Sequence, residues 1–78
     1  MSIGETITRK RKALGMTQKE LAEKLSVSFQ AVSKWETDAS HPDVELLTAL
    51  AEVLGTTVDA LVKRHILYYV TSTTGENF

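Results

Sequence analysis

A short stretch between residues 28 and 34 carries side chains of the types that contact nucleic-acid bases. If this stretch is helical, one face presents an amide, an ammonium group, hydroxyls and an aromatic ring. Amide and ammonium groups hydrogen-bond to base edges in a groove, and an apolar ring can lie on a thymine methyl group. The candidate base-contacting residues are Ser28, Phe29, Gln30, Ser33 and Lys34.

Residues earlier in the chain can contact phosphate. Gln18 stands at the start of an expected helix, where backbone N–H groups without intrahelical partners attract anions. The run Arg9-Lys10-Arg11-Lys12 adds positive charge, and a phosphate contact by Arg9 is one interpretation of it. The plainer interpretation is a solvated helix face formed by Arg9, Lys10 and Lys12, which is the usual place for such residues.

The charge of the whole chain argues against binding a polyanion by bulk attraction. Its 78 residues include 9 Lys and Arg against 10 Asp and Glu, for a net charge of −1 and an isoelectric point near 6.1. However, residues 1–36 carry seven basic and four acidic groups, whereas residues 37–78 carry two basic and six acidic groups. A domain polarised in this way can face an anion with one side.

Composition also bears on other function classes. No cysteine is present, so disulfides and cysteine-ligated zinc are excluded. His41 and His65 have no partners at metal-ligand spacing, and no nucleophile, base and orienting acid form a recognisable set. We therefore expect no enzyme, metal, cofactor or small-molecule substrate. Without a long apolar run or a signal-peptide pattern, we expect a cytoplasmic protein with no membrane segment.

Helix signals follow one another closely and predict an all-α domain of five short helices. Capping-box spacing opens the first two helices, and Gly15 and Gly55 are expected stops for the first and fourth. The expected N-caps are Ser2, Thr17, Ser28, Asp43 and Thr57.

Apolar residues at helical spacing then define the expected core. The first helix contributes Ile3, Ile7 and Leu14, and the third turns Ala31, Val32 and Trp35 inward. The apolar stripes of the second, fourth and fifth helices are Leu21, Ala22, Leu25, Val44, Leu47, Leu50, Ala51, Leu54, Val58, Leu61 and Val62.

At residues 17–36 the pattern resembles a known family. The stretch TQKELAEKLSVSFQAVSKWE, with PDVELLTALAEVLGTTVDALV behind it, is similar to the helix-turn-helix domains of phage repressors and Cro proteins, the lambda-repressor-like or XRE family. The resemblance runs from about Ile3 to Val62. It rests on TQ-x-ELA, the valine after the turn, the Trp-Glu pair, the proline before the fourth helix, and the LA-x-x-L-G-x-T stop.

The resemblance implies a compact five-helix domain whose third helix lies in the major groove of double-stranded DNA, commonly as a homodimer on a two-fold site. By position, base contacts fall to Phe29, Gln30 and Lys34, with Ser28 and Ser33 at the margin. Phosphate contacts fall to Gln18, Lys19 and Ser40.

Arg11 falls on the apolar stripe of the first helix, four residues after Ile7. A guanidinium buried there needs a partner, because an isolated buried charge is very costly. Members of this family commonly pair such an arginine with the residue that is Glu36 here. We therefore expect a structural Arg11–Glu36 ion pair.

The chain departs from the family pattern at two turns and in one loop. Ser26 and Asp38 stand where the family often has glycine, so a left-handed backbone there carries a strain of about 1 kcal/mol each. The loop Thr37–His41 has no Lys or Arg, so phosphate binding there depends on Ser40, backbone N–H groups and His41.

These observations predict a sequence-specific transcriptional regulator of double-stranded DNA, a repressor acting as a homodimer. The alternative is a protein-interaction or antitoxin-like module that docks a protein through the same helix-turn-helix face. We expect the domain to span residues 1–63 and a tail to span residues 64–78. The tail is β-branched and aromatic, which fits a strand, an extension of the fifth helix, a dimerisation arm or the remainder of a linker.

Overall fold

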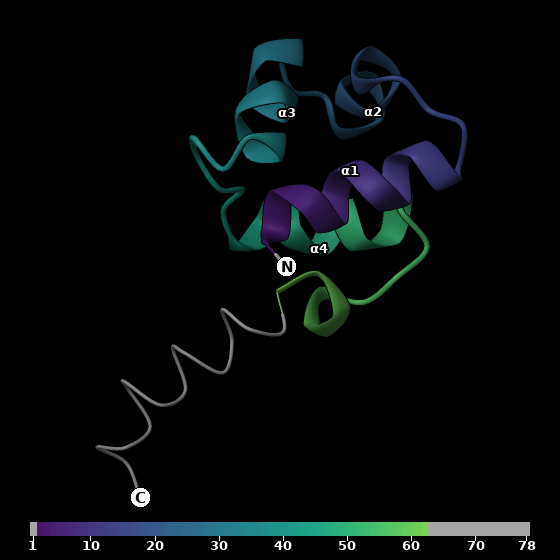
Figure 1. Cartoon of the computed structure of the whole chain (residues 1–78), viewed down its shortest axis with the longest axis vertical. Coiled ribbons are helices and arrows are strands. Elements are labelled where there is room, and N and C mark those ends of the chain that lie inside the picture. Colours follow the sequence, from purple (N-terminus) through teal and green to yellow (C-terminus); the bar gives the residue numbers. More distant parts are fainter. Residues whose placement is uncertain (1, 63–78) are drawn as a thin grey trace, which may run out of the picture.

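The structure is a computed structural model, and it describes residues 2–62 as a small helical domain (Figure 1). Its named helices are α1 (Ile3–Ala13), α2 (Gln18–Leu25), α3 (Phe29–Glu36) and α4 (Val44–Val53). Residues 58–62, the last of the described residues, are helical and belong to a fifth helix. No strand occurs within residues 2–62, so the predicted all-α, five-helix fold is confirmed.

Each helix begins directly after the residue expected to cap it. The Ser2 hydroxyl accepts the Glu5 N–H at 3.0 Å while the Glu5 carboxylate accepts the Ser2 N–H at 3.0 Å. Thr17 and Glu20 form the same reciprocal pair at 3.0 and 2.8 Å. The other three caps each accept one backbone N–H: Ser28, Asp43 and Thr57. These contacts satisfy donors that a short helix otherwise leaves unpaired.

The core lies where α2 contacts both α3 and α4 and where α1 contacts α3. In Figure 1, α2 and α3 lie above α1, and the short helix of residues 58–62 lies below α4. Trp35 is 4% exposed and belongs to this core, as predicted, so its ring is no external stacking surface. The largest fully buried side chains are Ile7, Leu21, Val32 and Leu50.

Two apolar residues that we expected in the core lie on the surface instead. Leu14 is 52% exposed and Val44 is 79% exposed. Leu14 is the C-cap of α1, where the chain leaves the helix, so helical spacing no longer sets its direction. Val44 is the first residue of α4, and the buried residues of that helix, Leu50 and Ala51, come two turns later. Periodicity assigns a face to a helix but does not show how far along it the core extends.

The first turn of α1 approaches the end of α3 very closely at Gly4. A Cβ on Gly4 would lie 2.5 Å from the Trp35 carbonyl oxygen and 2.7 Å from that of Glu36. The Gly4 N–H also donates to Asp38 Oδ1 at 3.0 Å. No local sequence pattern indicates this contact, which fixes α1 against the helix that carries the candidate base-contacting residues.

Both expected left-handed residues adopt that conformation. Ser26, the C-cap of α2, has φ 56°, and Asp38, after α3, has φ 63°. Ser26 sits in the turn that joins α2 to α3, so it sets the direction in which α3 leaves α2.

Two further expectations concern the ends of the domain and the membrane. The tail at residues 64–78 lies outside the described residues, so its interpretations stay predictions. Within residues 2–62, no helix is long and apolar enough to cross a membrane.

Candidate nucleic-acid interface

One side of α3 is buried in the core and the other is exposed to solvent. Val32 and Trp35 are buried, whereas Gln30 and Lys34 are exposed and Phe29 is 50% exposed. Gln30 and Lys34 are four positions apart and therefore neighbours on the helix surface, and Phe29 is exposed next to Gln30 in the first turn of the helix. The structure therefore brings the main predicted base-contacting side chains together on one accessible surface.

The two serines at the margin of this surface already have structural contacts. The hydroxyl of the exposed Ser28 accepts the Ala31 N–H at 3.1 Å and so caps α3. Ser33 is partly buried, and its carbonyl oxygen accepts the Thr37 hydroxyl at 3.2 Å. Both hydroxyls keep a hydrogen that can be donated to an acceptor.

The predicted phosphate-contacting residues come from three different segments. Lys19 is exposed in the first turn of α2, directly after the partly buried Gln18. Ser40 is partly buried beyond the end of α3, where its backbone N–H donates to the Lys34 carbonyl at 3.3 Å. Arg9 is exposed on α1 and helps to line a shallow hollow together with Glu5, Thr8, Lys12 and Glu36.

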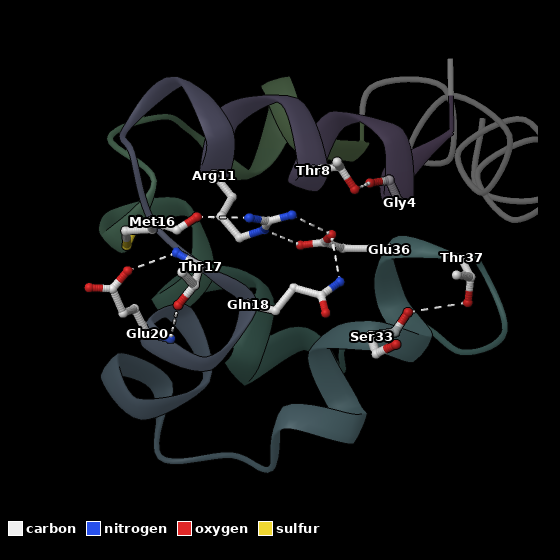
Figure 2. A network of polar contacts seen from close by, with 10 residues as sticks. All are labelled: Gly4, Thr8, Arg11, Met16, Thr17, Gln18, Glu20, Ser33, Glu36 and Thr37. Atoms are coloured by element: carbon white, nitrogen blue, oxygen red, sulfur yellow. Dashed lines mark hydrogen bonds and ion pairs between the residues drawn. The ribbon is translucent and has the colours of Figure 1, made fainter.

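Arg11 of α1 and Glu36 at the end of α3 form the expected ion pair (Figure 2). Arg11 Nε lies 2.7 Å from Glu36 Oε2, and Arg11 Nη2 lies 3.0 Å from Glu36 Oε1. The Arg11 Nη1 group also donates to the Met16 carbonyl oxygen at 2.7 Å. The two charged side chains are 10% and 5% exposed, so the pair is nearly enclosed.

The surroundings keep both members of the pair charged at neutral pH. Burial raises the pKa of Glu36, but hydrogen bonds from Arg11 and Gln18, together with the charge of Arg11, outweigh it and leave that pKa below its ordinary value. The hydrogen bond to Glu36 raises the pKa of Arg11. A carboxylate and a guanidinium in this geometry form a strong two-point contact.

Gln18 joins the same network, which residue spacing did not indicate. Its side-chain Nε2 donates to Glu36 Oε1 at 3.0 Å, so the amide is attached to the end of α3 (Figure 2). The bond spans 18 residues and depends on how α2 meets α3. No local sequence signal could have revealed it.

A metal site needs several ligating side chains close together. Within residues 2–62, no group of three or more His, Cys, Asp and Glu side chains is placed to hold a metal ion. The exposed polar side chains of α3 and the start of α2, such as Gln30, Lys34 and Lys19, are of the types that hydrogen-bond to nucleic acid.

Comparison with known proteins places this geometry in context. A helix-turn-helix family model, HTH_3, matches residues 7–61. The HTH-type transcriptional activator BcrR of Enterococcus faecalis is 36% identical over 62 residues, which cover 80% of this chain and 30% of BcrR. The chain spans less than half the length of BcrR and of the HTH-type transcriptional regulator ImmR of Bacillus subtilis, to which it is 36% identical and of which it covers 49%.

Solved structures show the same arrangement of helices. The c2 repressor of Salmonella phage P22, in complex with a synthetic operator in the presence of Tl+, superposes with a TM-score of 0.76 at 36% identity. That match covers 78% of this chain and 92% of the repressor chain. The biofilm regulator SinR in complex with DNA superposes with a TM-score of 0.72 at 33% identity, covering 77% of this chain and 97% of SinR.

Proposed function

The chain belongs to the XRE-type helix-turn-helix family, and on that premise we propose that it is a transcriptional regulator that binds double-stranded DNA sequence-specifically. The observation that carries the proposal is the outward side of α3, where Phe29, Gln30 and Lys34 are accessible together. The similarity to the P22 c2 repressor with its operator and to SinR with DNA supports it.

In this proposal α3 lies in the major groove of the DNA. Gln30 can pair with the N6 and N7 edge of adenine, and Lys34 can donate to the O6 and N7 edge of guanine. The Phe29 ring can lie on a thymine methyl group. Ser28 and Ser33 supply hydroxyl donors at the edges of the contact.

Phosphate contacts would set the position of α3 in the groove. Gln18 and Lys19 would hold one phosphate at the start of α2, where the helix dipole favours an anion. Ser40 and Arg9 would contact the backbone on either side. The small number of basic groups, in a chain of net charge −1, makes non-specific binding weak, so affinity depends on base contacts.

We further propose that the protein acts in the cytoplasm as a homodimeric repressor. Two copies of α3 would enter successive major grooves about 34 Å apart on a two-fold operator. A dimer bound there would repress by occlusion, because other proteins could not reach the same stretch of DNA. The family to which the chain belongs supports this arrangement.

Selection of bound duplexes from a random pool at physiological salt tests the DNA proposal and gives the half-site spacing. Against the selected duplex, Gln30→Ala and Lys34→Ala should each weaken binding by about 1–3 kcal/mol and relax preference at one base position. Glu23→Ala is the matched control, because Glu23 is an exposed residue of α2 outside this surface.

The salt dependence of binding separates DNA recognition from the docking of a protein. If the protein binds DNA, the logarithm of its binding constant should fall as the logarithm of the salt concentration rises, with a slope of about −0.9 for each phosphate contacted. If no duplex is enriched, or if binding does not change with salt concentration, the DNA proposal is wrong and the protein-docking alternative is favoured. Equal losses on every duplex would reassign Gln30 and Lys34 to phosphate contacts.

A further inference from the structure

The hydrogen bond between Gln18 and Glu36 determines which way round the Gln18 amide lies. A carboxylate only accepts hydrogen bonds, so the amide must turn its nitrogen toward Glu36. Gln18 Nε2 accordingly lies 3.0 Å from Glu36 Oε1, and Figure 2 shows the amide oxygen pointing away from the ion pair. One N–H and the carbonyl oxygen of the amide remain for other contacts.

The acceptor itself is held firmly. Arg11 contacts both carboxylate oxygens of Glu36, at 2.7 and 3.0 Å, and is itself fixed to the Met16 carbonyl at 2.7 Å. The Glu36 side chain is 5% exposed, so it has little room to adopt another rotamer. A series of contacts therefore runs from α1 through the end of α3 to the first residue of α2.

We propose that Glu36 is a positioning residue for DNA binding, which acts by orienting the side-chain amide of Gln18 at the start of α2. This inference rests on the proposed function. An oriented amide loses less rotamer freedom when DNA binds, which favours binding. Because Glu36 accepts one of the two Gln18 amide hydrogens, Gln18 donates only the other one to phosphate.

The orientation can be tested in the free protein by NMR of side-chain amides. The Gln18 amide should show one proton with slowed exchange and a hydrogen-bonded chemical shift. Glu36→Gln should weaken that signature, because it leaves one uncharged acceptor oxygen for which Arg11 and Gln18 compete. Lys19→Ala is the control, because the exposed Lys19 is next in sequence, and it should leave the signature unchanged. A wild-type Gln18 amide that exchanges like a solvent-exposed glutamine would overturn the inference.

A double-mutant cycle then tests the effect on the selected duplex. Gln18→Met keeps the side-chain length but removes the amide, and it should weaken binding about fivefold, as expected for one hydrogen bond. Glu36→Gln should also weaken binding about fivefold in wild type but by less than about twofold when residue 18 is Met. A control cycle that pairs Glu36→Gln with Glu23→Ala in place of Gln18→Met should be additive, because the exposed Glu23 has no proposed contact with DNA.

Equal losses from Glu36→Gln in both backgrounds would mean that Glu36 acts only through the stability of the fold, and the inference would fail. All variants are compared at a temperature where circular dichroism shows them folded. If Glu36→Gln does not fold, Glu36→Asp replaces it, because it keeps a charge for Arg11 while withdrawing the carboxylate from Gln18. Failure of the wild type to bind any duplex overturns the proposed function, whereas a solvent-like Gln18 amide overturns only this inference.

Discussion

Replacing Gly4 by alanine should destabilise the domain, although helix propensity alone predicts the opposite. Gly4 is the second residue of α1, and alanine is favoured over glycine by about 0.5–1 kcal/mol within a helix. The added Cβ would, however, lie 2.5 Å from the Trp35 carbonyl oxygen and 2.7 Å from that of Glu36. These atoms belong to the backbone of α3 and cannot move aside by a rotamer change.

The magnitude follows from the competition between these two effects. Overpacking a well-packed site costs about 1–3 kcal/mol, and the upper half of that range applies because the clash is with backbone. A shift of α1 would also lengthen the bond from the Gly4 N–H to Asp38 Oδ1, now 3.0 Å. After subtracting the propensity gain, we expect a net loss of about 2 kcal/mol in the free energy of unfolding.

Urea denaturation followed by tryptophan fluorescence measures this loss directly, because Trp35 is the one tryptophan of the chain and lies in the core. A thermal melt should show a decrease of roughly 8–16 °C in Tm, from 4–8 °C per kcal/mol for a domain of this size. Glu23→Ala, at an exposed position of α2, should stay within about 0.5 kcal/mol of wild type. If Gly4→Ala is as stable as wild type or more stable, the close approach of α1 to α3 is not as described.

Three further predictions concern stability. Arg11→Ala should lower the free energy of unfolding by about 3–5 kcal/mol, because it leaves the buried Glu36 carboxylate without its counter-charge. Arg9→Ala, at an exposed position of the same helix, should change Tm little. Equally small effects of the two substitutions in thermal melts would contradict the burial of the pair. Ser26→Gly should raise the free energy of unfolding, measured by urea denaturation, by up to about 1 kcal/mol, because glycine adopts the left-handed backbone at φ 56° without strain. Asp38→Gly should bring no such gain, because it removes the side chain that accepts the Gly4 N–H of α1. The lowered pKa of Glu36 means that its carboxylate binds fewer protons in the folded than in the unfolded chain. Its contribution to stability is therefore present above the unfolded pKa and is lost as the pH falls through the folded pKa. Across that range the urea midpoint should fall less in Glu36→Gln than in wild type.

Much of the fold could be predicted because its signals are local. A cap and the N–H that it satisfies lie three residues apart, so Ser2 with Glu5 and Thr17 with Glu20 could be recognised in the sequence. Ser26 and Asp38 could be recognised by comparison with the glycines that the family often has there. The Arg11–Glu36 pair was accessible for another reason: a charge on an apolar stripe requires a partner, and the family suggests which.

The candidate site was predictable only in part. The side of α3 that carries Gln30 and Lys34 follows from the burial of Val32 and Trp35, since helical geometry places the two sets on opposite sides. How these side chains relate to Gln18 did not follow from spacing. That relation depends on where the end of α3 meets the start of α2.

The sequence by itself determined where the helices begin and end, which sides are apolar and which family the chain resembles, because each of these depends on neighbours within one or two helical turns or on an ordered motif. The tertiary structure decided that Gly4 touches the backbone of α3, that Glu36 holds the amide of Gln18, and that Leu14 and Val44 are exposed. Those outcomes depend on the distance and angle between helices far apart in the chain, which the packing of the whole core sets and no local pattern records.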